Sequence, residues 1–224
     1  MENTKRAPSL RAIDMSTYDR LSVFRYFIHY DVPVYSRTVH IDISKCIKYI
    51  KKNNISFSLS MTVLVARAAN EVMEFRHRIR RNAIVEYDFI VPLYTHKWGD
   101  RPVTFVQGTY SGQFGEDYEE NLAIRNGVVK GQRQIIDFMD QGHVVVSINP
   151  WFSFTGLTFP YYRHTASVPV VAIGKYYEQT GQILLPVAIQ NHHALMDGFH
   201  VSQFVNNLTA YLAEPEKHMA LSSS

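Results

Sequence analysis

Residues 182–200 read Gln-Ile-Leu-Leu-Pro-Val-Ala-Ile-Gln-Asn-His-His-Ala-Leu-Met-Asp-Gly-Phe-His. The segment opens with a long apolar run, which is typical of a strand. A second apolar run, residues 168–176, precedes it, and the intervening Glu-Gln-Thr-Gly at 178–181 is typical of a hairpin turn. Beyond Gly198, apolar residues recur at helical spacing: Phe199, Val201, Phe204, Val205, Leu208 and Leu212. The last third of the chain therefore predicts a hairpin followed by a turn and an amphipathic helix.

The rest of the chain continues this mixture of strands and helices. Residues 58–75 carry apolar side chains at helical spacing with few charges, which predicts a mostly buried helix. A polar helix is predicted over about 116–140, and another runs through Ile50 until Asn53-Asn54 would end it. Apolar, β-branched and aromatic runs predict strands at residues 34–42, 83–87, 90–96, 102–107, 143–148 and 152–159.

Strands and helices that alternate along a chain without a linker indicate one compact α/β (α+β) fold. We expect a two-layer sandwich in which helices cover a largely antiparallel mixed sheet. Because no Pro-rich or Gly-rich linker and no internal repeat divides the chain, residues 1–224 are interpreted as a single domain. Residues 1–15 are expected to form an N-terminal extension, and residues 215–224 are expected to form a flexible tail.

The composition excludes a disordered chain, because 46% of the residues are hydrophobic and 19% are charged. The 14 Tyr, 13 Phe and 2 Trp fill a core, although such rings also suit subunit contacts and apolar pockets. The net charge is only +3. We interpret the basic run at residues 76–81 as a solvated helix end, with binding of a cofactor's phosphates as the alternative. Since no recognition motif accompanies this run, no nucleic-acid partner is expected.

Cys46 is the only cysteine, which excludes an intrachain disulfide and a thiol-rich metal site. It shares a helical face with Ile43, Ile47 and Ile50, so we interpret it as a core residue. The first residues lead into no apolar run, and no stretch approaches about 18 apolar residues, so neither a signal peptide nor a membrane span is expected. We therefore expect a cytoplasmic protein.

His193 and Asp197 are the pair in the opening stretch best suited to chemistry. Histidine can accept a proton near neutrality and return it, so His193 is a candidate general base. Asp197 can hold the local loop, and Gly198 permits a backbone turn that other residues resist. Taken alone, a pair of this kind is more often an ordinary turn or a buried hydrogen bond. No metal is expected, because adjacent histidines diverge on a strand and no second acidic ligand joins the candidate ligands His192, His193, Asp197 and His200.

The segment His-His-Ala-Leu-Met-Asp-Gly-Phe-His-Val, beginning at His192, resembles the active-site signature of the chloramphenicol acetyltransferases. Its shorter His-x-x-x-Asp-Gly core is shared with the dihydrolipoamide acyltransferases. Further segments are similar to the same family in order and spacing, so the resemblance covers nearly the whole chain after about residue 15. These segments are 41–44 (Ile-Asp-Ile-Ser), 91–95 (Val-Pro-Leu-Tyr-Thr), 147–155 (Ser-Ile-Asn-Pro-Trp-Phe-Ser-Phe-Thr), 174–177 (Gly-Lys-Tyr-Tyr) and 185–190 (Leu-Pro-Val-Ala-Ile-Gln).

The resemblance implies a role for four residues. His193 would be the general base that takes the proton of the acceptor hydroxyl as its oxygen attacks the thioester of acetyl-CoA, the co-substrate. Ser147 would donate a hydrogen bond to the oxyanion, a contribution of roughly 3 kcal/mol. Asp197 would pair with Arg20 and hold the active-site loop. Breaking such a pair from one side would cost about 3–5 kcal/mol if it is buried.

The resemblance also implies a homotrimer in which each active site lies between two subunits, with coenzyme A entering opposite the acceptor. The acceptor pocket of the family includes a tyrosine whose position falls at Phe27, or at Tyr26 if the alignment slips by one residue. Tyr35 keeps an aromatic ring that is expected to contact the acceptor. Pro33 lies where members of the family often have a small side chain. Ala172 replaces a small hydroxyl residue that some members place near the active site. These differences leave the acceptor less well defined than the chemistry.

Three functions therefore follow from the sequence. The first is O-acetyl transfer from acetyl-CoA to chloramphenicol, and the second is the same transfer to another small alcohol. The third is a non-catalytic relative that keeps the fold, against which the presence of His193, Ser147, Arg20 and Asp197 argues. A dihydrolipoamide acyltransferase is not expected, because the 224 residues leave no room for a lipoyl domain and its linkers.

Overall fold

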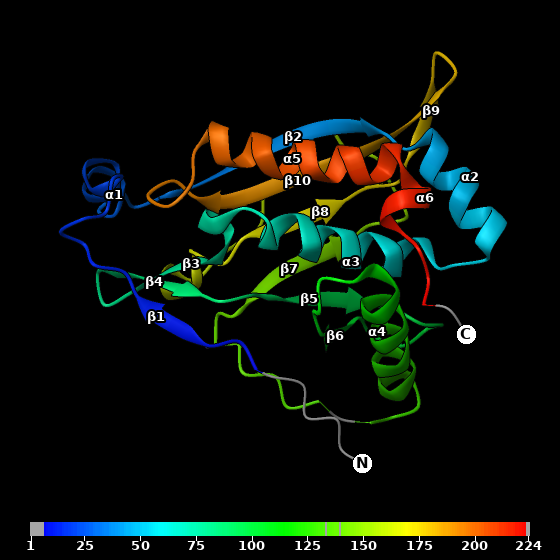
Figure 1. The fold of residues 1–224 in the computed structure, drawn as a ribbon, viewed down its shortest axis with the longest axis horizontal. Helices are drawn as coiled ribbons and strands as arrows, with labels where there is room; N and C mark the ends of the chain where they lie inside the picture. The colour runs from blue at the N-terminus through cyan, green and yellow to red at the C-terminus, as the bar shows by residue number, and fades with distance from the viewer. Residues whose placement is uncertain (1–6, 133, 139, 223–224) are drawn as a thin grey trace.

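The computed structural model describes residues 7–132, 134–138 and 140–222, which fold into two layers. One layer is a seven-stranded sheet, and the other is a set of helices that covers one face of it (Figure 1). A three-stranded sheet adjoins the large sheet. The predicted α/β sandwich with a mixed, largely antiparallel sheet is confirmed.

The strands of the large sheet are β2 (Val34–Asp42), β5 (Val91–His96), β6 (Thr104–Gln107), β7 (His143–Ile148), β8 (Val170–Ile173), β9 (Tyr177–Gln179) and β10 (Gln182–His192). Their order is β2-β10-β8-β7-β5-β6, and β9 pairs with β10. β5, β7 and β8 run parallel, whereas β10 runs antiparallel to β8. The carboxyl end of β10 therefore lies at one end of the sheet, and those of β5, β7 and β8 lie at the other (Figure 1).

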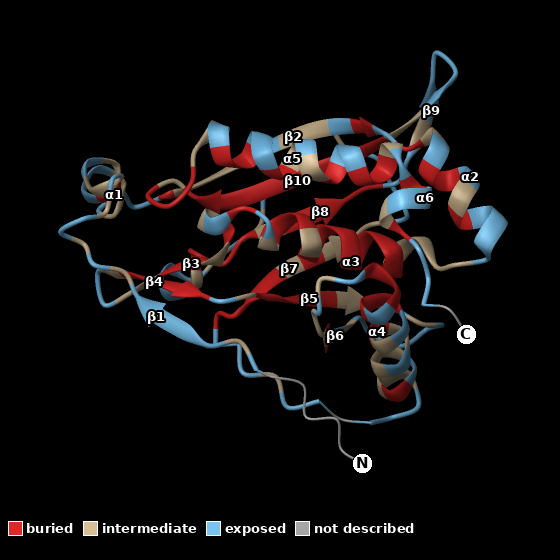
Figure 2. Ribbon diagram, in the orientation of Figure 1, coloured by how far each residue is buried: buried red, intermediate tan, exposed pale blue. Residues whose placement is uncertain are grey.

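The helices are α1 (Leu21–Phe27), α2 (Ser44–Asn53), α3 (Phe57–Asn70), α4 (Phe114–Val129), α5 (Gly198–Ala213) and α6 (Pro215–His218). α3 lies against the sheet and is the most thoroughly buried of them (Figure 2). Its sequence explains this, because Arg67 is its only charged residue. Ser56 caps its first turn by accepting a hydrogen bond from the Leu59 amide.

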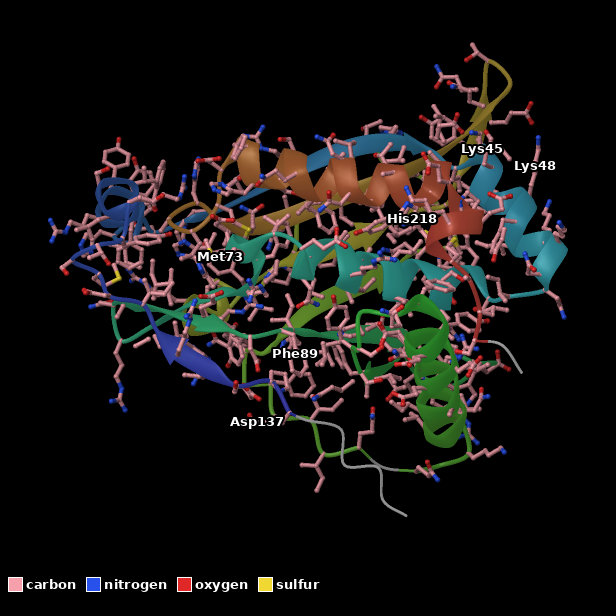
Figure 3. All side chains as sticks on the ribbon, viewed as in Figure 1. Lys45, Lys48, Met73, Phe89, Asp137 and His218 are labelled. Carbon is pink, nitrogen blue, oxygen red and sulfur yellow. The ribbon has the colours of Figure 1, made fainter. Side chains whose placement is uncertain are left out.

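α2 separates its apolar and charged side chains onto two faces. Cys46, Ile47 and Ile50 are buried in the core, while Lys45 and Lys48 point into solvent (Figure 3). The prediction that Cys46 is a core residue is confirmed, and burial raises the pKa of its thiol to about 12. Asn54 ends the helix in a left-handed conformation, as the Asn53-Asn54 pair predicted.

The interpretation of the basic run as a solvated helix end was wrong. Its first residue closes a 3₁₀ turn, η1 (Met73–Arg76), and residues 77–80 form strand β3 (His77–Arg80). Arg78 is fully buried and donates hydrogen bonds to four backbone carbonyls, so it is not available to a phosphate. The run of charges in the sequence does not reveal this site, because two of the four carbonyls, those of Gln141 and His143, come from a distant segment. β3 pairs with β4 (Ala83–Tyr87), which also pairs with β1 (Leu10–Ala12).

Several other boundaries differ from the prediction. The helix expected over residues 58–75 ends at Asn70. The helix expected over 116–140 ends at Val129, since Gly131 turns the backbone with a φ of 97°. Two residues of that range, 133 and 139, lie outside the described residues. The apolar run at 168–176 contributes only the four residues of β8 to the sheet.

No strand forms over residues 152–159, where one was predicted. The segment instead crosses the face of the sheet opposite the helices, because the Gln190 side chain takes the place of a strand partner. Its amide oxygen accepts from the Phe159 amide at 2.7 Å, and its nitrogen donates to the Phe159 carbonyl at 3.1 Å. Ser36 donates to the Leu157 carbonyl. A short 3₁₀ turn, η2 (Arg163–Thr165), follows this segment.

The expectation of a flexible tail from residue 215 does not hold for its first five residues. α6 occupies four of them, and Met219 is fully buried beside Cys46, with the two sulfur atoms 3.8 Å apart. Tyr49 donates a hydrogen bond to the Met219 carbonyl at 2.9 Å, which fixes the segment against α2. Among the described residues, no helix is long and apolar enough to cross a membrane.

Candidate active site

The loop that follows β10 carries His193 at one end of the sheet. The His193 amide donates to the Pro33 carbonyl at 2.8 Å, which extends the pairing of β10 with β2 by one residue. The amides of Leu195 and Met196 both turn back to the His192 carbonyl at 3.1 Å. This tight turn separates the strand from α5, so the direction of the His193 side chain is set by the backbone on both sides.

Two aromatic rings enclose the His193 imidazole. Phe27, the last residue of α1, stacks on it with ring centroids 4.0 Å apart and an angle of 6° between the planes. Tyr35 of β2 lies at 4.5 Å and is tilted by 44°. The Nδ1 atom of His193 is buried and has no hydrogen-bond partner within the described residues. The contacts therefore hold the ring in one plane and leave Nε2 as its accessible nitrogen.

Asp197 ends the loop and caps α5. One carboxylate oxygen accepts from the Phe199 amide at 2.9 Å, and the other accepts from the Arg20 guanidinium at 2.6 Å. Burial opposes the ionisation of Asp197. The hydrogen bonds from Arg20 and from the Phe199 amide, together with the nearby charge of His200, nevertheless lower the pKa of Asp197 to about 2. The structure thus brings together Arg20 and Asp197, which lie 177 residues apart in the chain.

Gly198 serves this turn through its lack of a side chain, not through its backbone freedom. Its φ is not in the left-handed region, contrary to the reason suggested by the sequence. A Cβ atom at this position would lie 3.1 Å from the guanidinium of Arg37, which packs across the start of α5. The Arg37 guanidinium also lies 5.1 Å from the centre of the Tyr35 ring, so it belongs to the surroundings of His193.

Ser147 lies far from His193 within one chain. Ser147 pairs with Ala172, and Ala172 pairs with Ala188, five residues before His193. With about 3.3 Å per residue and about 4.8 Å per strand, the two Cα atoms are roughly 15–20 Å apart. Ser147 also alternates with the core residues Val144 and Val146, so its side chain faces away from the helices.

The other residues that the sequence analysis linked to the acceptor pocket, Tyr26, Pro33 and Ala172, lie at different distances from His193. Tyr26 is 63% exposed and contacts the Phe27 ring edge-on at 5.0 Å, so it lies one ring further out. Pro33 supplies the backbone carbonyl that holds the His193 amide. Ala172 is fully buried at the centre of the sheet beside Ser147.

A cavity of about 750 Å³ opens at the opposite end of the sheet, between the start of α3 and the carboxyl ends of β5, β7 and β8. Three cationic side chains line it, Lys97, Arg125 and Lys175, together with four aromatic ones, Phe57, Tyr94, Trp151 and Tyr176. Its volume and its mixture of rings and cations suit a large anionic ligand with an apolar portion. Ile148, the residue after Ser147, forms part of its inner wall. The sequence signals for this cavity are the segments 147–155 and 174–177.

The histidines around the loop do not gather as a metal site. Within the described part of the chain, no group of three or more His, Cys, Asp or Glu side chains is arranged to hold a metal ion. His192 is buried, which lowers its pKa to about 4, and its Nδ1 accepts from the Ala194 amide. His200 lies with its Nδ1 3.0 Å from Asp197 Oδ1 and its Nε2 3.4 Å from Glu74 Oε1. Glu74 was missed by sequence reasoning, because nothing local marks it.

The chain is similar to known proteins over almost all of its length. A family model described as "Chloramphenicol acetyltransferase" matches residues 9–209. A relative named chloramphenicol acetyltransferase from Escherichia coli is 31% identical over 215 residues, which are 94% of this chain and 97% of the relative. A relative of the same name from Clostridium butyricum is 30% identical and covers 88% of this chain and 91% of its own length.

The fold of the chain is also similar to those of solved acetyltransferase structures. A chloramphenicol acetyltransferase superposes with a TM-score of 0.79 at 25% identity, covering 91% of this chain and all of the other. A probable dihydrolipoamide acetyltransferase from Listeria monocytogenes has a TM-score of 0.64 at 14% identity, covering 99% and 98% of the two chains. The second likeness concerns the fold alone.

Proposed function

The chain belongs to the chloramphenicol acetyltransferase family, and we propose that it transfers an acetyl group from acetyl-CoA to a hydroxyl of chloramphenicol. Membership of the family makes it an acyltransferase. The observation that carries the proposal is the environment of His193. The imidazole is stacked on Phe27, and its loop ends on the Asp197–Arg20 pair. Such a ring is oriented before substrate arrives, which is what a general base requires.

We assign the proton transfer to Nε2 of His193, since Nδ1 is buried. Nε2 takes the proton of the acceptor hydroxyl while the oxygen forms a bond to the thioester carbon. When the tetrahedral intermediate collapses, the carbon–sulfur bond breaks, and the imidazolium returns its proton to the departing thiolate. A base of this kind contributes about 10²–10⁴-fold to the rate.

We place acetyl-CoA in the 750 Å³ cavity. Lys97, Arg125 and Lys175 would meet its phosphates, and Trp151 and Tyr176 offer apolar surface to the rest of the molecule. The cavity reaches Ile148 at the end of β7, and the thioester would have to extend past this end of the strand to the face of the sheet that carries the Ser147 hydroxyl. That hydroxyl would then donate a hydrogen bond to the oxygen that becomes negatively charged.

The separation of Ser147 from His193 in one chain supports an active site made by two copies. A roughly 15–20 Å gap cannot be closed by side-chain rotation, because strand register fixes both backbones. Trp151, Phe152 and Tyr162 are each more than half exposed next to the sheet face that carries Ser147. Exposed rings of this kind are enriched at subunit contacts. We therefore propose a homotrimer in which His193 of one subunit meets Ser147 of the next.

Thiol release from acetyl-CoA in the presence of chloramphenicol tests the proposed function directly. The native chain should release thiol only when both substrates are present, and acetylated chloramphenicol should accumulate in equal amount. His193→Ala should lower kcat by about 10²–10⁴-fold, because the hydroxyl then loses its proton acceptor.

His40→Ala is the matched control for His193→Ala. His40 is an exposed histidine of β2 whose ring contacts Tyr177, and its variant should keep native kcat. If the folded native chain binds acetyl-CoA but gives no thiol release with chloramphenicol, the acceptor assignment fails. Release with another small alcohol would then identify the second acceptor class.

A further inference from the structure

A buried chain of polar groups connects the loop of His193 to the helical layer. The Arg20 guanidinium donates to the Asp197 carboxylate at 2.6 Å, and His200 Nδ1 accepts from the Asp197 amide at 3.2 Å. The other ring nitrogen of His200 lies 3.4 Å from Glu74. The side chains of His200 and Glu74 are only 8% and 15% exposed. Asp197 is therefore held from two directions, by the N-terminal segment through Arg20 and by the core through His200.

His200 occupies a position at which helices ordinarily place a capping partner. It is the third residue of α5, and its Nδ1 accepts from the Asp197 amide at 3.2 Å while Asp197 caps the helix in return. Glutamate or glutamine normally completes such a capping box. Histidine has a second nitrogen on the far side of its ring, so it can continue the contact to Glu74, which a capping amide or carboxylate would reach less readily.

Glu74 anchors this contact in a rigid part of the molecule. It lies in η1, between the end of α3 and strand β3, and its neighbour Phe75 is fully buried against Phe204 of α5. Burial opposes ionisation of Glu74, but the hydrogen bond from His200 and the nearby His200 and His77 keep its pKa below the ordinary value. A charged carboxylate that is nearly buried keeps its histidine partner in place more firmly than an exposed one.

The loop between His193 and Asp197 is short, so the position of its two ends decides the direction of the imidazole. β10 fixes the first end through the Pro33 carbonyl, and Asp197 fixes the second. We propose that His200 and Glu74 are positioning residues for His193, acting through Asp197 on the proposed acetyl transfer. Neither touches the imidazole, so their loss should misdirect the base without removing it.

Kinetics of four variants test this inference. His200→Ala and Glu74→Ala should each lower the kcat of folded enzyme by about 10–100-fold, as expected for a misplacement of about 1 Å. The KM for acetyl-CoA should stay unchanged, because the proposed cavity lies at the other end of the sheet. The double variant should lose no more than either single variant, because the two residues act as one unit. His200→Gln should recover part of the rate by restoring the capping contact.

Val201→Ala is the matched control. Val201 is the next residue of α5, is buried and lies outside the polar chain, so its truncation costs stability without touching Asp197. This variant should keep native kcat even where its thermal unfolding temperature falls as far as that of His200→Ala. Equal losses of kcat in the two variants would overturn the inference, because the effect would then be general destabilisation.

Hydrogen exchange separates this inference from the proposed function on which it rests. The amides of His193, Leu195 and Met196 should exchange faster in His200→Ala and Glu74→Ala, and at the native rate in Val201→Ala. This measurement needs no acceptor, so it remains informative if the native chain proves inactive on chloramphenicol. Native exchange rates at these three amides in the two alanine variants would overturn the positioning role.

Discussion

At the scale of single residues, the surroundings of His193 are unusually apolar for a candidate base. Phe27 covers one face of the ring at 4.0 Å, and Tyr35 approaches at 4.5 Å. A flat hydrocarbon ring limits the rotation of the imidazole and keeps water from one side of it. It cannot donate a hydrogen bond to an acceptor molecule, so the choice of phenylalanine at position 27 bears on which alcohol is bound.

Phe27→Tyr tests whether this position contacts the acceptor. The stacked ring should stay in place, and the added hydroxyl should give the acceptor one more hydrogen bond. The KM for chloramphenicol should then fall by about 2- to 10-fold, which corresponds to about 0.5–1.5 kcal/mol, with little change in kcat.

Tyr26→Phe is the companion change for that measurement. If position 27 is the acceptor contact, removing the hydroxyl of the exposed Tyr26 should leave the KM for chloramphenicol unchanged. A rise in KM for Tyr26→Phe, with none of the expected fall for Phe27→Tyr, would move the acceptor contact to Tyr26.

At the scale of secondary-structure elements, three strands carry buried histidines that favour the neutral form. Burial lowers the pKa of His77 in β3, His143 in β7 and His192 in β10 from 6.5 to about 4. In the unfolded chain these groups take up protons below about pH 6.5, whereas the folded chain resists this until about pH 4. Between the two values the unfolded state binds more protons, so stability falls as the pH falls.

The free energy of unfolding should therefore already decrease between about pH 7 and about pH 5. Over the whole range down to about pH 4, this decrease should be at most roughly 3 kcal/mol per histidine. Urea denaturation at several pH values measures this slope. His143→Asn removes one of the three groups and should make the slope shallower. A slope identical to that of the native chain would mean that His143 already binds its proton in the folded state.

At the scale of the whole molecule, antiparallel pairing of β10 with β8 decides how the candidate site can be assembled. It sends the carboxyl end of β10 away from the carboxyl ends of β7 and β8 (Figure 1). His193 and the 750 Å³ cavity consequently lie at opposite ends of one sheet. If acetyl-CoA binds in that cavity, a second copy has to bring its His193 to the thioester.

Mixing two inactive variants tests this arrangement. His193→Ala should lose about 10²–10⁴-fold in kcat because the base is missing, and Ser147→Ala should lose about 10²–10³-fold because the oxyanion donor is missing. In a mixed oligomer, a subunit that keeps His193 can meet a neighbour that keeps Ser147. Co-refolding the two variants should therefore restore a substantial fraction of native activity.

The control for this experiment is the double variant His193→Ala/Ser147→Ala co-refolded with His193→Ala. That mixture contains no intact histidine and should stay inactive. If the two single variants also fail to complement each other while forming oligomers of native size, His193 and Ser147 do not share a site between copies.

Much of the fold could be predicted from the sequence, because its elements are marked by local patterns. The apolar run before His193 and the helical spacing after Gly198 correspond to β10 and α5. Prediction failed where backbone groups found partners from far away. Gln190 bonds to Phe159, which does not form the expected strand, and the distant carbonyls of Gln141 and His143 accept hydrogen bonds from the buried Arg78. Neither partner can be inferred from neighbouring residues.

The sequence by itself determined the fold class, the family, and His193 and Asp197 as a candidate pair, since short-range spacing and residue type carry this information. Only the tertiary structure decided that Glu74 contacts His200, and that Ser147 lies roughly 15–20 Å from His193 in one chain. The physical reason is that periodicity specifies which face of an element is apolar, whereas strand order, direction and register specify where that face lies. Contacts across 177 residues depend on the second kind of information.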